Sequence, residues 1–397
     1  MSNATVSVAS LAEVNPRTER PSNRAQEVSF IPMSDVSEAG RWVGRQTRLL
    51  SEVEVGYTAF REGDVLFAKI TPCMENGKGA FVTGLKNGIG FGSTEFHVLR
   101  AIAGRCDPGF LAQISAFHEV REKAVAFFTG SAGQRRVSEK FFENYFVPHY
   151  STDEQRRIAD LLAAVDEQIA LLESRITKSK LVKEGLVRDI LARLADAPRR
   201  PLRNAAEVGS GVTLGRKFTG PGTRDYPYLR VANVQDGHID LTEVKTIRLP
   251  EAAASRAMLR EGDVLMNEGG DFDKLGRGAV WNGEIKGCLH QNHVFRVRCD
   301  QTVLLPEFLA LWAASEFGKK FFMLASKQST NLASINSTQL KKFPVLLPKL
   351  DDQRDALRLI GGISGALELD SREVEKLRLQ KQGLAADLIS GKRRVLS

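Results

Sequence analysis

The chain has 397 residues, of which 42% are hydrophobic and 26% charged, and its formal net charge is +8. This composition is ordinary for a folded globular protein, and the length suits two or three domains. No apolar run reaches membrane-spanning length, residues 1–15 lack the regions of a secretion signal, and the four cysteines form no Cys-x-x-Cys pair. We therefore expect a cytoplasmic protein with reduced thiols. The basic balance suits a polyanionic partner, with nucleic acid first and a membrane surface second.

Residues 1–150 have the pattern of a globular domain that contains strands and helices. Gly63-Asp64 is a turn signal directly before the apolar run Val65–Ala68, which predicts a strand. The spacing of apolar residues between Pro108 and Phe128 predicts helix. Further strands are expected at Val28–Met33 and Phe96–Leu99, and polar loops at Thr71–Gly79 and Thr129–Gln134.

A long helix is predicted at Ser151–Leu194. Ser151 and Glu154 have the spacing of a capping box, and no proline follows until Pro198. A heptad seam comprises Leu162, Val165, Ile169, Leu172, Ile176, Ser179, Lys183, Leu186 and Ile190. A helix of about 40 residues spans roughly 60 Å, and so narrow an apolar stripe needs a partner helix.

The partner helix is expected in the same chain, because the pattern recurs at Leu350–Ser390. Gln155 corresponds to Gln353, which is a shift of 198 residues. The second seam comprises Ile360, Ile363, Leu367, Asp370, Val374, Leu377, Lys381, Leu384 and Leu388. Lys183 and Lys381 occupy the same interior slot, and we hypothesise that these lysines set the register of the helix pair.

The repeat extends beyond the helices. Arg260–Leu265 corresponds to Arg61–Leu66, and Tyr228–Val234 corresponds to the strand near Phe30. We expect domains at 1–150 and 197–348, a central long helix at 151–196 and a C-terminal long helix at 349–397. The loops of the two copies differ, and a shared scaffold with divergent loops suits two different binding surfaces. Antiparallel helices would give the chain a pseudo-two-fold, with recognition domains spaced for DNA half-sites about one turn (~34 Å) apart.

Motifs for several kinds of chemistry are absent from the sequence. Asn76-Gly77-Lys78-Gly79 lacks the hydroxyl that would follow in a nucleotide-binding P-loop, and no Asn-Pro-Pro-Phe/Tyr motif of a DNA methyltransferase is present. Alternation along a strand would place Cys288 and His290 on one face and His293 on the other, which is poor geometry for zinc. We therefore expect no catalytic site, no metal and no cofactor in this chain.

The divergent loops carry the side-chain types that read DNA. Base edges are read mainly by Asn, Gln, Arg, Lys, Ser and Thr, and phosphates by Lys and Arg. In the first copy, the candidate DNA contacts are Lys69, Thr71, Asn76, Lys78, Ser93, Thr94, Ser131, Gln134, Arg135 and Arg136. In the second copy, they are Asn267, Lys274, Arg277, Gln291, Asn292, His293, Lys327, Gln328, Ser329 and Asn331. Gln134–Arg136 and Lys327–Asn331 occupy corresponding loops, so they are the strongest clusters.

With these features, the chain resembles the DNA-specificity subunit of a type I restriction-modification system over essentially its whole length. The resemblance rests on Glu154–Ala159, on Gly185-Leu186 to Ile190 of the same helix, on Phe67–Gly79, and on the two-fold repeat. The second copy departs from the pattern in two ways. Asp352-Gln353-Arg354-Asp355 stands where the first copy has Glu154–Arg157 with its basic pair Arg156-Arg157, and Gly361-Gly362 falls early in the helix.

The resemblance implies two mixed α/β (α+β) target-recognition domains joined by two long antiparallel coiled-coil helices. Each domain would read one half of a split site in double-stranded DNA. The helices would dock two methyltransferase subunits, which bring S-adenosylmethionine and modify adenine, and motor-nuclease subunits would join to cut unmodified DNA. No membrane role is implied. Two other readings stay open from the residues alone: a stand-alone DNA-binding or architectural protein, and a coiled-coil scaffold that binds protein at both ends. A fused enzyme is disfavoured by the chain length.

Overall fold

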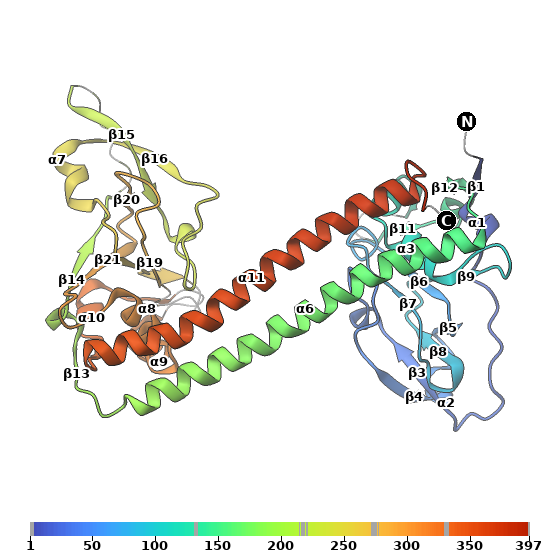
Figure 1. The fold of residues 1–397 in the computed structure, drawn as a ribbon, viewed down its shortest axis with the longest axis horizontal. Coiled ribbons are helices and arrows are strands. Elements are labelled where there is room, and N and C mark those ends of the chain that lie inside the picture. Colours follow the sequence, from blue (N-terminus) through green and yellow to red (C-terminus); the bar gives the residue numbers. More distant parts are fainter. Residues whose placement is uncertain are drawn as a thin grey trace. The chain divides into compact units, whose positions relative to one another are not determined.

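The structure is a computed structural model that describes residues 4–130, 134–213, 215, 219, 221–270, 276, 278–328 and 333–395. The chain divides into two compact units. The first unit comprises residues 1–175 and 370–397, and the second comprises residues 176–369. Each unit contains one globular region and the adjoining halves of two long helices (Figure 1).

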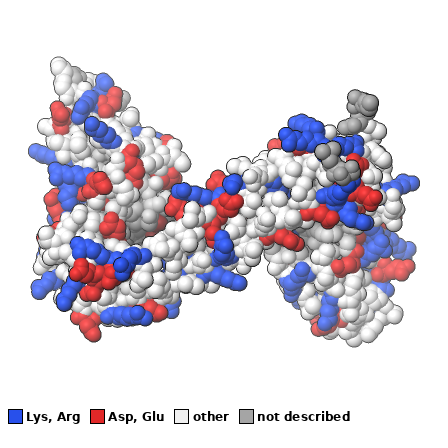
Figure 2. Space-filling model, in the orientation of Figure 1, with Lys and Arg blue, Asp and Glu red and all other residues white. Residues whose placement is uncertain are grey.

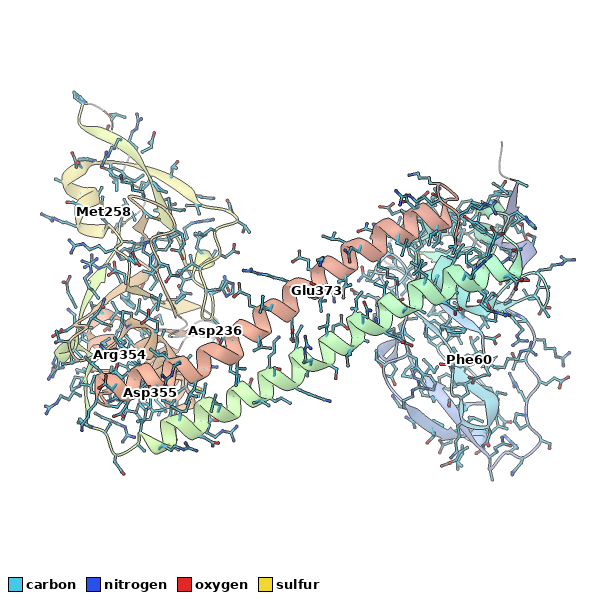
Figure 3. The ribbon with its side chains drawn as sticks, viewed as in Figure 1. Phe60, Asp236, Met258, Arg354, Asp355 and Glu373 are labelled. Carbon is cyan, nitrogen blue, oxygen red and sulfur yellow. The ribbon has the colours of Figure 1, made fainter. Side chains whose placement is uncertain are left out.

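The globular region of the first unit is built on two four-stranded sheets. One has the order β2 (Ala12–Val14), β9 (Phe96–Ala101), β6 (Val65–Ala68), β7 (Gly79–Phe81); the other has the order β4 (Gln46–Leu49), β3 (Glu27–Ile31), β8 (Ile89–Gly92), β5 (Thr58–Arg61). Neighbouring strands are antiparallel, except for the parallel pair β3 and β8. All of β6 is buried, as expected for a strand between two packed layers, and Phe60 of β5 is fully buried (Figure 3).

Shorter elements complete the first globular region. Two short antiparallel pairs are β1 (Thr5–Ser7) with β12 (Phe146–Pro148) and β10 (Phe128–Thr129) with β11 (Arg136–Val137). The helices are α1 (Val8–Leu11), α2 (Leu50–Val53), α3 (Pro108–Ala116), α4 (His118–Ala124) and α5 (Lys140–Asn144). The helix predicted between Pro108 and Phe128 is therefore too long. Phe117 has an extended backbone with ψ 130°, which separates α3 from α4.

The second unit has an equivalent set of sheets. The four-stranded sheet has the order β14 (Ala206–Ser210), β21 (Val294–Cys299), β17 (Asp263–Asn267), β19 (Gly278–Val280). Two three-stranded sheets have the orders β16 (Lys245–Pro250), β15 (Thr223–Leu229), β20 (Leu289–His290) and β18 (Gly269–Gly270), β23 (Ala333–Ser334), β22 (Lys327–Gln328). The remaining pair is β13 (Arg199–Pro201) with β24 (Pro344–Leu346). Its shorter helices are α7 (Glu251–Ala254), α8 (Pro306–Ala314), α9 (Glu316–Ala325) and α10 (Ser337–Lys341).

The strand orders confirm the internal repeat and the mixed α/β class. The order β2-β9-β6-β7 recurs as β14-β21-β17-β19, and the parallel pair β3–β8 recurs as β15–β20. The strand predicted at Tyr228–Val234 ends earlier, at Leu229. Its continuation is a 3-10 turn at Val231–Asn233, because the Asn233 side chain accepts a hydrogen bond from the Arg230 amide (2.8 Å).

The repeated Gly-Asp turn is explained by a buried ion pair in each unit. In the first unit, both oxygens of Asp64 accept hydrogen bonds from Arg100 at 2.8 Å, and Asp64 is 1% exposed. In the second unit, Asp263 accepts from Arg298 at 2.7 Å in the same bidentate way. Each aspartate also caps its own turn by accepting an amide bond, so these residues serve the scaffold.

The two long helices are α6 (Thr152–Arg193) and α11 (Leu350–Ile389). The predicted capping box is confirmed: Glu154 accepts a bond from the Ser151 amide (3.0 Å), and Ser151 accepts one from the Glu154 amide (3.3 Å). None of the eighteen seam positions is exposed. Within the first unit, Asp166 pairs with Lys381 at 2.7 Å and Arg175 pairs with Asp370, which makes the helix halves antiparallel.

A buried glutamine ties the start of each long helix to its globular region. The Gln155 side chain accepts a bond from the Asp107 amide and donates to the carbonyls of Arg105 and Tyr150. Gln353 makes the equivalent three bonds in the second unit. Both glutamines are at most 2% exposed, so losing either amide would leave buried backbone groups unpaired.

Candidate nucleic-acid interface

The candidate residues of the first unit are brought together where β6 ends. The Lys69 amide donates to the Glu95 carbonyl (2.9 Å), and the Lys69 carbonyl accepts from Val137 (2.9 Å). The Thr71 amide donates to the Arg135 carbonyl (3.0 Å). These bonds hold three loops side by side, and the loops carry Lys69 and Thr71, Ser93 and Thr94, and Gln134, Arg135 and Arg136. Ser131 lies outside the described residues.

The loop from Thr71 to Gly79 is held from both sides. The Thr71 hydroxyl donates to Glu75 (2.5 Å), while Asn76 is exposed at the tip. The Lys78 ammonium donates to the Met33 carbonyl (3.3 Å), so this lysine is partly engaged with the protein itself. Any anion it binds would compete with that contact.

A buried arginine supports the same loop from below. Arg121 is 2% exposed, donates to the carbonyls of Ser115 (2.8 Å) and Lys78 (3.2 Å), and stacks 3.7 Å from the Phe67 ring centroid. Burial lowers the pKa of Arg121 to about 9, because its charge has left water. The residue is a scaffold for the loop that sequence reasoning missed.

A carboxylate lies among the cations of the first cluster. Glu95 accepts two hydrogen bonds from Arg136, at 2.7 and 2.8 Å, and remains 25% exposed. The Arg136 hydrogen bonds lower the pKa of Glu95, so this pair stays charged at neutral pH. A paired carboxylate at such a place can accept a bond from a base amino group, whereas it repels phosphate.

In the second unit, the same backbone positions carry different side chains. The Glu268 amide donates to the His293 carbonyl (3.0 Å), which is the bond that Lys69 makes to Glu95 in the first unit. The Glu268 carboxylate lies 2.5 Å from the exposed His293 imidazole. Gln291 and Asn292 directly follow β20 and are partly exposed. The chemistry offered at this position thus differs between the units.

The remaining candidates of the second unit divide into two groups. Asn267 is 3% exposed, and its amide donates to the carbonyls of Val231 and Val234, which favours a structural role. Lys327 and Gln328 form β22, whose backbone pairs with β23. Lys274, Arg277, Ser329 and Asn331 lie outside the described residues.

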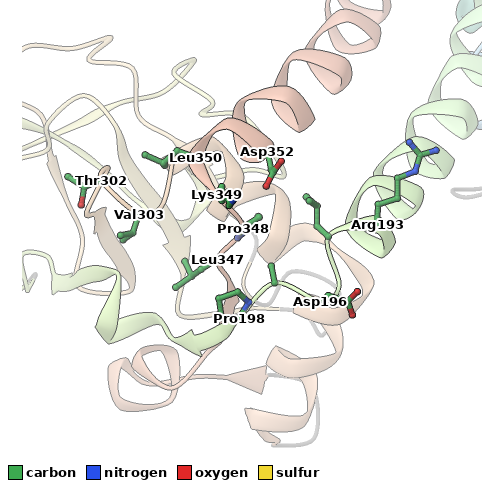
Figure 4. Close-up of a pocket in the computed structure, with 12 residues that line it drawn as sticks. Arg193, Asp196, Pro198, Thr302, Val303, Leu347, Pro348, Lys349, Leu350 and Asp352 are labelled. Carbon is green, nitrogen blue, oxygen red and sulfur yellow. The ribbon is translucent and has the colours of Figure 1, made fainter.

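The described residues hold no group of three side chains suited to a metal ion. Cys288 and His290 are buried, and burial lowers the pKa of His290 to about 4, so its ring is neutral at pH 7. None of the helices within the described ranges is apolar and long enough to span a bilayer. A hollow of about 610 Å³ in the second unit, near the end of α6, has a mixed lining that includes Arg193, Lys349 and Asp352 (Figure 4).

The charge of the surface is mixed. Figure 2 shows Lys and Arg side chains interspersed with Asp and Glu on the viewed face of both globular regions. The net charge of +8 is therefore not gathered into one stripe on that face. On that face, local clusters rather than a continuous basic surface are the places that could hold a polyanion.

The sequence of this chain is similar to those of named curated proteins. No protein-family model matches the chain. It is 37% identical over 207 residues to the specificity subunit of the type I restriction enzyme EcoEI from Escherichia coli, covering 51% of the chain and 33% of that protein. It is 36% identical over 196 residues to the EcoAI specificity subunit from Escherichia coli, covering 47% of the chain and 32% of that protein. Over about half of its length, the chain is similar to type I restriction specificity subunits.

This relation extends to solved structures at the level of the fold. The matched part spans about a third of the length of the EcoEI and EcoAI subunits. A structure of a type I restriction-modification system covers 99% of the chain with a TM-score of 0.58 at 17% identity. The type I system S subunit from M. genitalium covers 97% with a TM-score of 0.57 at 13% identity. The chain therefore shares its overall fold with these two structures.

Proposed function

We propose that this chain is the DNA-specificity subunit of a type I restriction-modification complex, in which each globular region reads one half of a bipartite target. The proposal is carried by the duplication of one scaffold with different side chains at equivalent backbone positions. Lys69 lies beside Glu95 in the first unit, whereas Glu268 lies beside His293 in the second. Two copies that share a frame and differ at the loop cluster suit recognition of two different half-sites.

The long helices support docking of two copies of one partner, which we take to be the methyltransferase subunit. Six leucines outside the seam are exposed, and their positions repeat at the 198-residue shift: Leu161, Leu171, Leu181, Leu359, Leu369 and Leu379. Leu171 and Leu369, for example, are 71% and 67% exposed. Large apolar side chains exposed at repeated positions suit contacts with a protein partner, and their repetition suits two copies of that partner.

The chemistry of modification and cleavage is assigned to partners. S-adenosylmethionine would be bound by the methyltransferase subunits, and motor-nuclease subunits would cut DNA that is not methylated. The role of this chain would be to bind the target and to orient those subunits on it. The loop clusters at the ends of β6 and β17 would make the base contacts, with Arg121 holding the first of them in place.

The test is a genome-wide map of methylated adenines in cells with and without this chain, with the methyltransferase supplied. A split motif that appears only with the chain is expected. Exchanging the loop 327–331 for that of another specificity subunit should then change one half of the motif and leave the other unchanged. Exchanging 131–136 is the matched control and should change only the opposite half. A map that is the same with and without the chain would overturn the proposal in favour of a stand-alone DNA-binding protein.

A further inference from the structure

A second group of cations in the first unit lies outside the loop cluster described above. Arg17, Arg20 and Arg61 line a hollow of about 500 Å³. All three side chains are exposed, and within the described part of the chain none of them has a carboxylate partner. Three guanidinium groups without a carboxylate partner repel one another at this hollow, and a bound anion would reduce that repulsion.

The hollow is built on a rigid base. The buried Arg100, which is paired with Asp64, donates to the Thr18 hydroxyl (3.0 Å) and to the Arg17 carbonyl (3.4 Å). Thr18 in turn donates to the Ala59 carbonyl (3.4 Å). The backbone that carries two of the three arginines is therefore fastened to the sheet, so little ordering of this backbone is needed when a ligand binds.

The chemistry of the lining selects a phosphate group. A guanidinium presents a planar fork of N–H donors that matches phosphate oxygens and remains charged at all physiological pH values. Glu19 is the one unpaired acid in the lining, so three arginines and one glutamate leave a formal charge of +2. This excess suits one or two phosphate oxygens with a negative charge.

The hollow continues toward the candidate loop cluster. It adjoins a second hollow of about 1050 Å³, which shares Arg17, Thr18, Glu19 and Arg20 and extends to Asn15. The Asn15 amide donates to Glu139 (2.5 Å) and contacts the His97 ring (3.0 Å), close to the loop that carries Arg136. An open path of this kind suits an extended chain of phosphates better than a single small anion.

We propose that Arg17, Arg20 and Arg61 form a phosphate-binding site, and, resting on the proposed function, that its ligand is the backbone of the target DNA beside the first half-site. The site would strengthen binding without selecting a sequence, because phosphates are the same at every base pair. It would thus position the first recognition region, while the loop cluster reads the bases. None of these three arginines was among the residues expected from the sequence to contact DNA.

The test uses the full chain with its methyltransferase partners and a duplex that contains the target found by the methylation map. Binding is measured against salt for the wild type and for Arg17→Ala/Arg20→Ala/Arg61→Ala. We expect the triple variant to bind about 10 to 100 times more weakly and to lose about one to three from the slope of log K against log salt, since each phosphate contact contributes about 0.9. The preference for the target over a duplex with a changed half-site should stay the same.

Two control variants separate this site from general charge effects. Arg105→Ala/Lys178→Ala/Arg188→Ala removes three exposed cations from outside the hollow and should leave the slope unchanged. Arg17→Lys/Arg20→Lys/Arg61→Lys keeps the charge and should keep most of the slope. Melting curves of all variants would show that they fold.

The phosphate could come from DNA or from a free anion, and a parallel titration with pyrophosphate distinguishes these two sources. If pyrophosphate binds the wild type and not the alanine variant while the DNA slope is unchanged, a free anion is the ligand and DNA as the source is overturned. If neither DNA nor pyrophosphate binding changes, the site itself is overturned. The proposed function fails separately, when the wild-type complex shows no preference for its target.

Discussion

The two halves of the helix pair are alike in their apolar seam and unlike in their charges. In the first unit, Asp166 of α6 is a centre of polar contacts: Lys381 lies 2.7 Å from its carboxylate, and Arg41 donates to its carbonyl (2.7 Å). The equivalent residue in the second unit is Ser364, which donates to the Ile360 carbonyl of its own helix (2.9 Å). At this position, the apolar seam is shared by both copies, whereas the contacts with Lys381 and Arg41 belong to the first copy.

The difference extends to a second position. Arg175 and Asp370 form a bidentate pair in the first unit, and the Arg175 hydrogen bonds lower the pKa of Asp370. Their counterparts at the shift of 198 are Glu373 and Leu172, which also lie in the first unit and cannot form that pair. Apolar packing can thus hold a repeated helix pair together, while charges can diverge because exposed ion pairs contribute little free energy.

The strongest test of this comparison targets the seam in both copies. Leu162 is 0% exposed and its counterpart Ile360 is 7% exposed. We expect Leu162→Ala and Ile360→Ala each to lower the free energy of unfolding of the respective unit by about 4 kcal/mol, because each leaves a cavity in a packed core. Urea denaturation followed with hydrogen exchange in each unit measures this effect.

The controls are the neighbouring exposed leucines. Leu161 and Leu359 are 42% and 54% exposed. Their replacement by alanine should change the free energy of unfolding by less than about 0.5 kcal/mol. A large loss in one unit and none in the other would contradict a shared apolar frame.

Features with a local sequence signal could be predicted. The heptad seam, the capping box at Ser151 and the Gly-Asp turns depend on neighbours within a few residues, and the structure confirms the seam and the box. The strand order could be expected only as a repeat, since pairing partners are distant in sequence. The long helical stretch after Pro108 was predicted without its break at Phe117, because no glycine or proline marks that position.

The candidate site depends more on long-range contacts. Asn267 was predicted to contact DNA from its residue type, yet its amide is buried against Val231 and Val234. Arg121 and the arginine hollow were missed because their neighbours come from segments dozens of residues away. The loop cluster at Lys69 and Arg136 was predicted in part, since polar residues after a strand carry a local signal, but the Glu95 partner was not.

Acid should destabilise the second unit, and also the first to the extent that burial lowers the pKa of His97 there. Burial lowers the pKa of His290 in the second unit from 6.5 to about 4, and its ring bonds to the Val294 carbonyl (2.7 Å). The unfolded chain therefore binds a proton at a higher pH than the folded one, so stability falls as the pH drops from 6.5 toward 4. The loss is expected to reach about 3 kcal/mol at pH 4, measured as the urea midpoint of the second unit.

The matched variants test whether His290 is responsible. His290→Leu should remove most of the loss between pH 6.5 and 4 in the second unit, although it lowers stability at pH 7 by leaving the Val294 carbonyl unpaired. His238→Leu, at an exposed position of the same unit, should leave the pH dependence unchanged. An unaltered acid loss in His290→Leu would assign the effect to other groups.

The smallest expected effect tests the two interior lysines that were hypothesised to set the register. Lys381 pairs with Asp166 and its side chain is 20% exposed, whereas Lys183 has Ser364 at the position equivalent to Asp166. Lys381→Met should lower the free energy of unfolding of the first unit by about 1 kcal/mol, because Asp166 keeps Arg41 and Gln113 as partners. Lys183→Met should cost nothing or stabilise the second unit, since a seam lysine without a carboxylate gains from becoming apolar. If both substitutions cost the same, the lysines act through a shared register device rather than through the ion pair of one copy. Cysteines introduced on α6 and α11 would report the register of the two helices by cross-linking. An equal change of register in the Lys381→Met and Lys183→Met variants would then identify that device.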